Sequence, residues 1–241
     1  MKRLLVILYQ PYKWLFFLPF LVINTLFFGV VAVLFSFLFN QRIGSLYGGA
    51  LWSKLNGLLT PMFVSVEGKH NINPGTSYVV VSNHQSAYDI FLIYGWIGID
   101  IRWIMKKELK KVPGIGFGSE MVGHIFLDRS NPIKAMESIN EAKKKLVNGT
   151  SVVIFPEGTR TKNGELGVFK KGAFKIASDL GLPILPVTIV GTEKILPNNS
   201  TNLLPGRVKL VIHQPIGVDQ YNGMDVEKLI NEVREKIQSS H

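Results

Sequence analysis

The chain has 241 residues, enough for one well-packed catalytic domain with an accessory segment but hardly for two full domains. Its formal net charge of +10 predicts a surface that attracts anions such as nucleic acid, anionic lipid or phosphorylated substrates. The sequence contains no basic helix, aromatic RNA-binding signature or set of zinc ligands, so nucleic acid is not expected as a partner. Cysteine is absent, which excludes disulfide bonds, cysteine-ligated zinc and a cysteine nucleophile.

The N-terminal part of the chain carries most of the apolar excess. Residues 14–40 include no charged side chain and form a run long enough to span the apolar core of a bilayer. Pro19 and the polar pair Asn24 and Thr25 interrupt this run, so two shorter helices folded as a hairpin compete with a single span. No small-x-small pattern follows it, which disfavours a cleaved signal peptide. Either arrangement predicts that residues 1–55 form a helical segment attached to a membrane.

Residues 56–241 are predicted to form an α/β catalytic domain. Short β-branched runs bounded by Gly, Pro or Asn predict buried strands at residues 78–81, 101–105, 125–127, 152–155, 184–190 and 208–213. Apolar periodicity and end signals predict helices at residues 90–96, 132–147, 173–180 and 225–238. This alternation predicts a mostly parallel or mixed sheet flanked by helices. Because ligands gather outside the carboxyl ends of strands in such sheets, the residues that follow each strand are the candidate site.

His84 and Asp89 form a candidate catalytic pair. The strand at 78–81 leads through Ser82 and Asn83 to His84, and Asp89 begins the apolar helix that follows. Residues five apart do not share a helical face, so His84 must lie in the turn with Asp89 reaching back towards it. A carboxylate on one imidazole nitrogen fixes the tautomer and stabilises the imidazolium that forms when the other nitrogen takes a proton. The pair therefore predicts a general base that activates a hydroxyl.

Two other interpretations of this segment stay open. Asn83 or Asp89 can simply cap the helix, since Asn and Asp are common at helix starts, and His84 would then be an ordinary loop residue. Alternatively, His84, Asp89 and Glu157 could ligate zinc. No His-x-x-x-His or similar pairing accompanies them, so we expect no metal.

A second candidate cluster is the run Glu157-Gly158-Thr159-Arg160, which follows another predicted strand. Gly158 permits a tight turn, and Arg160 offers a planar fork of donors for a phosphate. Arg129 follows a third predicted strand and supplies a second arginine at a comparable level. Each arginine alone is better explained by a surface ion pair, but two that converge on neighbouring strand ends would bind a phosphomonoester bidentately.

Taken together, these blocks resemble the glycerolipid acyltransferase superfamily, and within it the 1-acyl-sn-glycerol-3-phosphate acyltransferases. The resemblance covers about residues 60–215. Its motifs, in chain order, are Asn83-His84-x-x-x-x-Asp89, residues 123–129, Glu157-Gly158-Thr159-Arg160 and residues 182–187. Any one of these is weak, whereas all of them in sequence are specific. Ala87 and Tyr88 replace the family's bulkier pair before the aspartate and leave the catalytic pair intact.

The resemblance implies transfer of a fatty acyl group from acyl-CoA or acyl carrier protein to the sn-2 hydroxyl of lysophosphatidic acid, giving phosphatidic acid without an acyl-enzyme. His84 would deprotonate that hydroxyl and Asp89 would orient His84. No resident cofactor is implied, because the acyl donor is a co-substrate. The implied substrate-binding residues are Arg129, Glu157, Gly158, Thr159, Arg160 and Asn83, with Lys106, Lys107 and Lys171 as helpers. Lysines in such charge runs are solvated by default, and these three carry less weight.

Other functions remain alternatives. The same chemistry could act on another acceptor, such as glycerol-3-phosphate or another lysolipid, and the paired Arg129 and Arg160 favour an acceptor that carries phosphate. A hydrolase would use water in place of the lipid hydroxyl. A non-catalytic lipid-binding membrane protein would have no use for the pair of His84 and Asp89. We expect lysophosphatidic acid, an acyl donor and a membrane lipid surface as partners, with the catalytic domain on the cytoplasmic face of the cell membrane.

Overall fold

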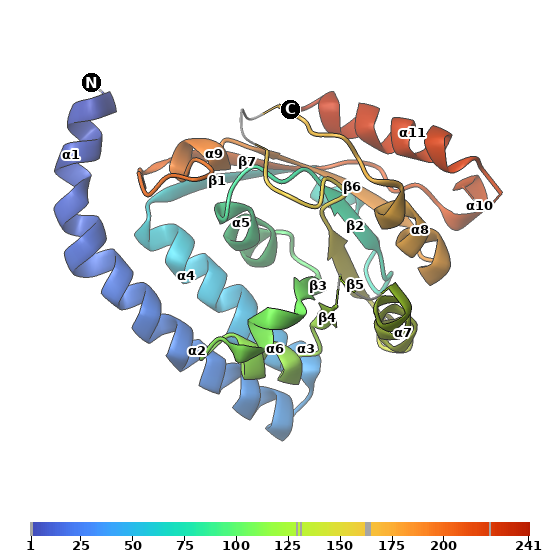
Figure 1. Ribbon diagram of the computed structural model, residues 1–241, viewed down its shortest axis with the longest axis horizontal. Coiled ribbons are helices and arrows are strands. Elements are labelled where there is room, and N and C mark those ends of the chain that lie inside the picture. Colours follow the sequence, from blue (N-terminus) through green and yellow to red (C-terminus); the bar gives the residue numbers. More distant parts are fainter. Residues whose placement is uncertain (1, 129, 131, 162–164, 222) are drawn as a thin grey trace.

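The computed structural model describes residues 2–128, 130, 132–161, 165–221 and 223–241. Within these residues the strands form one seven-stranded sheet in the order β1-β7-β6-β2-β5-β3-β4 (Figure 1). The strands are β1 (Met62–Glu67), β2 (Val79–Ser82), β3 (Asp100–Lys106), β4 (Ile125–Leu127), β5 (Thr150–Ile154), β6 (Ile184–Val190) and β7 (Gly206–Ile212).

The sheet is mixed, as the sequence predicts. Strands β6, β2, β5, β3 and β4 run parallel to one another, whereas β7 is antiparallel to β6 and β1 is parallel to β7. The carboxyl ends of β2, β3, β4 and β5 therefore lie along the same edge of the sheet. The loops that leave this edge carry most of the candidate site residues.

The predicted strands agree closely with the observed ones. β4 and β6 have the predicted bounds, and the other four predicted strands differ from the observed ones by one or two residues at an end. The exception is β1, which the sequence analysis did not predict. This edge strand alternates in burial, with Met62 buried and Phe63 62% exposed, so it lacks the continuous apolar run that marks the central strands.

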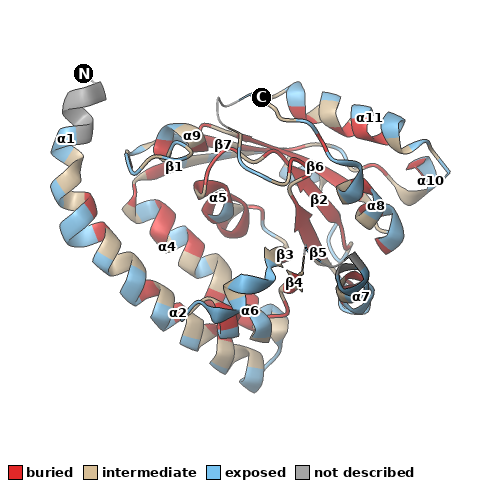
Figure 2. Cartoon of the chain, in the orientation of Figure 1, coloured by how far each residue is buried: buried red, intermediate tan, exposed pale blue. Residues whose placement is uncertain are grey.

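Helices cover both faces of the sheet, so the domain has three layers (Figures 1 and 2). Alternate residues of β2 enter opposite cores: Val80 packs on one side, and Val79 and Val81 pack on the other. The first core lies beneath the N-terminal helices and α5 (Tyr88–Trp96). The second core is covered by α7 (Pro132–Lys143), α8 (Lys171–Leu180), α10 (Val218–Tyr221) and α11 (Val226–Gln238). Two short helices, α6 (Gly116–Met121) and α9 (Thr192–Ile195), lie outside the second core. Single 3-10 turns are η3 (Lys69–Asn71) and η4 (Lys107–Lys111).

The N-terminal apolar run forms one long helix rather than two short ones. α1 (Lys2–Tyr12), a π-helical turn (η1, Lys13–Phe17) and α2 (Leu18–Leu38) follow one another without a break. Pro19 lies in the first turn of α2, directly after the π-helical turn, where the missing backbone N–H is tolerated. Of the two arrangements that the sequence left open, a division of the run at Pro19 or at Asn24 and Thr25 is therefore wrong. Over Ile7–Leu38 the helix is long and apolar enough, by length and composition, to cross a membrane.

A helical hairpin does form, but its turn lies at Asn40. The side chain of Asn40 accepts a hydrogen bond from the backbone N–H of Ile43 at 3.0 Å and so caps the returning helix. That helix comprises α3 (Gln41–Gly44), a π-helical turn (η2, Ser45–Ala50) and α4 (Leu51–Leu59). Buried Asn24 donates to the side-chain oxygen of Asn56 at 3.2 Å, so this polar residue joins the two arms instead of breaking the helix. The division into residues 1–55 and 56–241 stays a prediction, and α4 runs across it.

Gly48 provides a test of how tightly the two arms pack. A Cβ at Gly48 would overlap the Cβ and backbone of Ala32 on α2, so Gly48→Ala should destabilise the fold by about 1–3 kcal/mol through overpacking. Gly172, on α8, is a matched control because nothing lies within 4 Å of its added Cβ. Gly172→Ala should stabilise the protein by about 0.5–1 kcal/mol through helix propensity. Thermal unfolding in detergent measures both, and equal effects would contradict the packing argument.

Candidate active site

The imidazole of His84 is bonded to the carboxylate of Asp89. His84 lies in the turn between β2 and α5, and its Nδ1 is 2.8 Å from Oδ2 of Asp89 in the first turn of α5. The Asp89 side chain is fully buried, whereas the His84 side chain is 15% exposed. Because Nδ1 faces the carboxylate, Nε2 is the nitrogen that can take a proton from a bound hydroxyl.

Three further hydrogen bonds hold the carboxylate of Asp89. Its Oδ2 accepts from the backbone N–H groups of Gln85 at 2.6 Å and Ser86 at 2.9 Å. Its Oδ1 accepts from the hydroxyl of Thr192, the first residue of α9, at 2.5 Å. A buried carboxylate needs such partners, because an unpaired one is strongly destabilising. Asp89 thus both stabilises the turn and orients His84, which separates this arrangement from a simple helix cap.

Asn83 has a structural role in this turn. Its side-chain nitrogen donates to the carbonyl of Ile189 on β6 at 2.9 Å, and its side-chain oxygen accepts from the Ile189 N–H at 2.8 Å. Only 1% of Asn83 is exposed. Its amide groups are therefore engaged with the neighbouring strand, and the expected direct contact between Asn83 and substrate does not fit this geometry.

The ring and backbone of His84 are also held from β5 and the loop that follows it. The ring stacks on Phe155, with centroids 4.0 Å apart and an interplanar angle of 11°. The backbone N–H of His84 donates to Oε1 of Glu157 at 2.8 Å, and its carbonyl accepts from Thr161 N–H at 2.9 Å. Neither Phe155 nor Thr161 was predicted, because only the pairing of β2 with β5 brings them beside His84.

Glu157 joins two loops rather than pointing into open space. Oε2 accepts from the backbone N–H of Gly167 at 2.9 Å, while Oε1 accepts from His84, and only 5% of the residue is exposed. Burial raises the pKa of the Glu157 carboxyl, and the two backbone hydrogen bonds oppose that rise. The sequence analysis expected Glu157 to contact substrate, but its oxygens instead hold the backbone on either side of the site.

We call the two hydrogen bonds that Glu157 accepts from the His84 and Gly167 backbones the clamp. An open depression of about 410 Å³ lies beside it. Its lining residues come from residues 157–161 and 165–170 and include Thr159, Arg160 and Lys170. Arg160 and Lys170 are both exposed, so the depression carries two cations, together with the carboxylates of Glu157 and Glu165, next to the loop that holds His84. Gly158 has φ +73°, and a Cβ there would come within 2.9 Å of the Lys170 amine. Gly158 therefore gives both the left-handed turn and the space for the lysine.

Lys170, not Lys171, is the lysine of this depression. The amine of Lys171 lies 2.5 Å from the carboxylate of Glu227 on α11, and this contact raises the Lys171 pKa. The expected role of Lys171 as a substrate helper is therefore not supported. The two lysines are adjacent in the sequence. Which of them faces the loop depends on how α8, which begins at Lys171, is rotated about its axis, and only the structure shows that rotation.

Lys106 and Lys107 lie at the same edge of the sheet but outside this depression. Lys106 ends β3, and Lys107 begins η4 with its amine 3.5 Å from the carboxylate of Asp128. Both lysines are exposed. Arg129, the second predicted phosphate-binding arginine, lies outside the described residues. Among the residues that the structure describes, no group of three His, Cys, Asp or Glu side chains could hold a metal ion.

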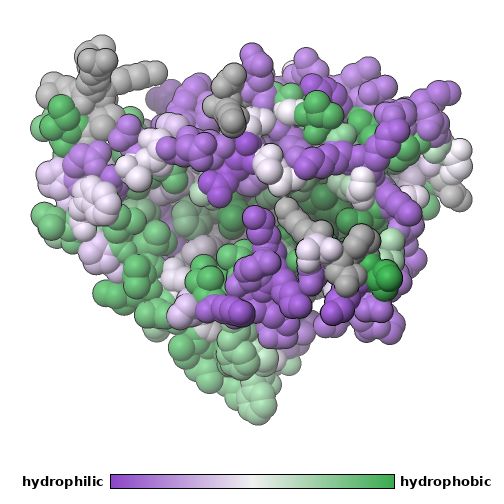
Figure 3. All heavy atoms as spheres, viewed as in Figure 1, coloured by the Kyte–Doolittle hydropathy of each residue, from purple (hydrophilic) through white to green (hydrophobic). Residues whose placement is uncertain are grey.

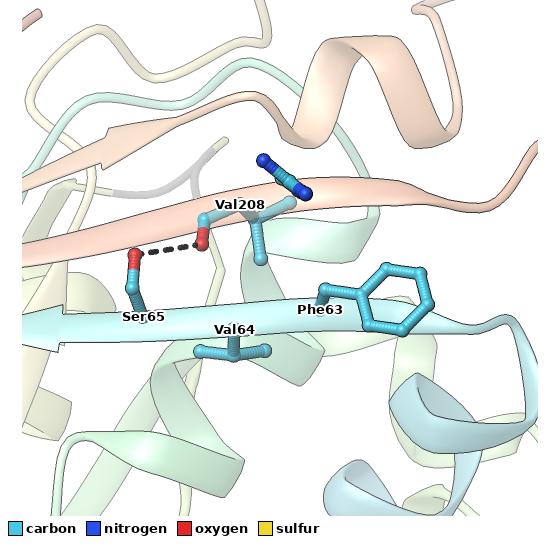
Figure 4. Close-up of a pocket in the computed structure, with 5 residues that line it drawn as sticks. Phe63, Val64, Ser65 and Val208 are labelled. Carbon is cyan, nitrogen blue, oxygen red and sulfur yellow. Dashed lines mark hydrogen bonds between the residues drawn. The ribbon is translucent and has the colours of Figure 1, made fainter.

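A second depression, of about 430 Å³, lies between β1 and β7 (Figure 4). Phe63, Val64, Ser65, Arg207 and Val208 line it, and the hydroxyl of Ser65 donates to the Val208 carbonyl at 3.4 Å. These lining residues include neither an imidazole nor a carboxylate, so they offer no general base. We therefore assign the chemistry to the edge that carries His84.

A half-buried imidazole bonded to a buried carboxylate at the strand ends, beside a depression that Arg160 and Lys170 help to line, is suited to group transfer in an α/β fold. Comparison with known families shows which class of enzyme this is. A family model described as Acyltransferase matches residues 63–190, which include His84, Asp89 and Glu157. The chain therefore belongs to the acyltransferase family.

Individual proteins that are similar to this chain indicate which acyltransferases it resembles. The chain is 37% identical over 193 residues to the chloroplastic 1-acyl-sn-glycerol-3-phosphate acyltransferase LPAT1 of Arabidopsis thaliana, covering 79% of this chain and 52% of that protein. It is 32% identical over 172 residues to the alpha enzyme of the same name from Ovis aries, covering 71% of this chain and 60% of that protein. The chain thus spans about half the length of the first of these curated relatives. The crystal structure of the 1-acyl-sn-glycerophosphate (LPA) acyltransferase PlsC from Thermotoga maritima superposes with a TM-score of 0.82 at 31% identity, covering 100% of this chain and 96% of that one.

The clamp formed by Glu157 can be tested with an isosteric substitution. Glu157→Gln sets an amide N–H against one of the two backbone N–H groups, which should cost about 1–3 kcal/mol of stability. The loosened His84 loop should also slow acyl transfer by about 10- to 100-fold. Glu165→Gln is the control, because Glu165 lines the same depression but is exposed. Thermal unfolding and transfer rates measure both, and a Glu157→Gln protein indistinguishable from the control would contradict the clamp.

Proposed function

We propose that this protein transfers a fatty acyl group from a thioester donor to the sn-2 hydroxyl of lysophosphatidic acid, forming phosphatidic acid for phospholipid synthesis. The observation that carries the proposal is the hydrogen-bonded pair of His84 and Asp89 beside a depression lined by Arg160 and Lys170. The similar proteins, which are named 1-acyl-sn-glycerol-3-phosphate acyltransferases and come from a plant and a mammal, support it.

The reaction we propose needs one base and no covalent intermediate. Nε2 of His84 takes the proton of the sn-2 hydroxyl as its oxygen attacks the thioester carbonyl, and Asp89 stabilises the imidazolium. The carbon–sulfur bond then breaks, and the imidazolium returns the proton to the leaving thiolate. The chain has no cysteine and no Gly-x-Ser-x-Gly segment, so its sequence offers no such nucleophile for an acyl-enzyme. We propose that acyl-CoA or acyl carrier protein is the donor and that no resident cofactor takes part.

The two cations favour an acceptor that carries a phosphate. Arg160 offers a planar set of donors, and Lys170 offers a compact charge beside the turn at Gly158. Glu157, in the same lining, is engaged with backbone N–H groups, and a phosphomonoester would pair with Arg160 and Lys170, whereas an uncharged lysolipid would not. Glycerol-3-phosphate carries the same group and is the nearest alternative acceptor. The apolar N-terminal helix favours the lipid, because it is suited to hold the site at a membrane.

We propose that the N-terminal hairpin enters one leaflet of the membrane rather than crossing it. The catalytic domain contacts the long helix along its length: Tyr9 donates to the Thr60 carbonyl at 3.1 Å, and Lys13 donates to the Thr201 carbonyl at 2.8 Å. Gly29 lies against Gly114 further along the helix. A perpendicular span needs about 20 residues free of the domain, and these contacts leave no such stretch. The catalytic domain would then lie on the cytoplasmic face of the cell membrane, where the proposed donors are found.

Loss of the base should abolish transfer. We expect His84→Ala to lower the rate by at least about 10²- to 10⁴-fold, and Asp89→Asn by up to about 10⁴-fold, because the imidazole loses its partner. His70→Ala, on the exposed turn η3, is the control and should keep full activity. The assay follows labelled acyl-CoA with lysophosphatidic acid in detergent, with glycerol-3-phosphate as competing acceptor. Near-wild-type transfer by His84→Ala protein would end the proposed mechanism.

The acceptor site can be tested by charge removal. Arg160→Ala and Lys170→Ala should each raise the KM for lysophosphatidic acid by about 10- to 100-fold, the size expected for a lost charge-assisted hydrogen bond, with a smaller change in kcat. Lys171→Ala is the matched control, because its amine pairs with Glu227 instead, and its KM should not change. A monoacylglycerol acceptor without phosphate should not distinguish these variants. An unchanged KM for both Arg160→Ala and Lys170→Ala would remove these residues from a phosphate site.

A further inference from the structure

Residues 107–121 form a surface segment that combines exposed apolar side chains with lysines; we name it the η4–α6 segment. Phe117 is 64% exposed and Val112 is 38% exposed. Lys110 and Lys111 are also exposed. In the space-filling view the lower apex of the molecule is largely hydrophobic, and a hydrophilic cluster lies directly above it near the position of η4 and α6 (Figures 1 and 3). The segment therefore lies at a boundary between apolar and charged surface.

Glycines fix this segment against the long N-terminal helix. A Cβ on Gly29 of α2 would come within 2.5 Å of the Gly114 carbonyl oxygen, and a Cβ on Gly118 of α6 would come within 3.3 Å of the Gly29 Cα. The two backbones are thus in direct contact, as small residues allow at helix interfaces. Because of this contact, the η4–α6 segment must follow α2 to whatever depth α2 takes in a membrane.

The apolar surface is continuous between α2 and the η4–α6 segment. Leu26 of α2 is 47% exposed, and its side chain approaches a Cβ placed on Gly114 to 3.2 Å. Val30, one turn further along α2, is 58% exposed. Exposed apolar groups on two contacting elements form one patch, and patches of this kind mark membrane or protein contacts in soluble domains.

The charge of the segment distinguishes between those two partners. Residues 107–121 contain three lysines and two glutamates, for a net charge of +1, in a chain whose net charge is +10. Lys110 pairs with Glu120 at 2.8 Å, and its amine also lies 5.1 Å from the centre of the Phe126 ring. Lysines beside exposed aromatic and aliphatic side chains are the pattern of interfacial membrane contacts, since the alkyl stems lie on apolar groups while the amines reach headgroups.

We propose that the η4–α6 segment is a second membrane contact, in which Phe117 and Val112 enter the acyl region and Lys110 and Lys111 bind anionic lipid headgroups. This inference rests on the proposed attachment of the N-terminal hairpin to one leaflet. Its consequence is orientation: η4 begins directly after β3, so this contact turns the carboxyl edge of the sheet, with His84, towards the lipid that supplies the acceptor. An inserted hairpin alone would leave the whole protein free to roll about the long axis of the hairpin.

The absence of cysteine makes the contact measurable at single positions. Phe117→Cys, labelled with a polarity-sensitive fluorophore in the full chain, should be quenched by lipids brominated in their acyl chains when reconstituted into phosphatidylcholine and phosphatidylglycerol nanodiscs. Val147→Cys is the matched control: this residue is 51% exposed, lies just before β5 at the opposite edge of the sheet, and should not be quenched. Quenching of Phe117→Cys no greater than that of Val147→Cys overturns the second contact.

Phe37→Cys separates this inference from the attachment on which it rests. Phe37 is 79% exposed near the turn of the hairpin and should be quenched most strongly. If the label at Phe37→Cys is quenched and that at Phe117→Cys is not, the hairpin alone inserts and the second contact is overturned. If neither is quenched, the proposed membrane attachment fails as well.

The headgroup contact is tested by removing charge in the same labelled protein. Lys110→Gln with Lys111→Gln should reduce the quenching at Phe117→Cys by about twofold in nanodiscs that contain phosphatidylglycerol, and should have little effect in pure phosphatidylcholine. Lys144→Gln with Lys145→Gln removes the same charge near the end of α7 and should change neither. Transfer in detergent should be unaffected by either pair, since none of these lysines lies in the site. Equal effects of both pairs would overturn the anionic-lipid contact.

Discussion

The carboxylate of Asp89 is fully buried and faces the imidazole of His84. It accepts hydrogen bonds from the backbone N–H groups of Gln85 and Ser86 and from the hydroxyl of Thr192. A charge in this position is strongly destabilising unless each oxygen is paired, so the turn after β2 and the start of α9 must assume this arrangement together. The same bonds that make the burial of Asp89 tolerable aim His84. Stability and preparation for catalysis therefore have one physical cause here.

A second buried carboxylate extends this principle across the site. Glu157 holds the backbone of His84 with one oxygen and the backbone of Gly167 with the other, so it cross-links the loops that follow β2 and β5. Phe155 stacks on the imidazole and fixes its plane. Arg160 and Lys170, the cations of the depression, lie on the loop that this clamp holds. Base and depression are thus set in position before any substrate binds, which is what positional catalysis requires.

The loop between α9 and β7 connects the site to the N-terminal helix. The carbonyl of Leu196 accepts from the Ser86 hydroxyl at 2.7 Å, and the side chain of Asn198 donates to the Thr161 carbonyl at 3.3 Å. Further along the loop, the Thr201 carbonyl accepts from buried Lys13 at 2.8 Å. The long N-terminal helix and the turn that carries His84 therefore contact the same short segment. Separation of the helix from the domain would break a contact with the same loop that holds the turn of His84.

Patterns that depend on neighbouring residues were readable from the sequence: the β-branched central strands, the mixed sheet, and the pair of His84 and Asp89, which are only five residues apart. Tertiary contacts decided the rest. The pairing of Asn83 with Ile189 joins residues 106 apart, and edge strand β1 lacked a continuous apolar run because one face meets water. Glu157 became a clamp, and Lys170 rather than Lys171 reached the depression, because packing sets the phase of each helix and the neighbours of each loop. Sequence spacing fixes short-range geometry, whereas long-range partners exist only once the sheet has formed.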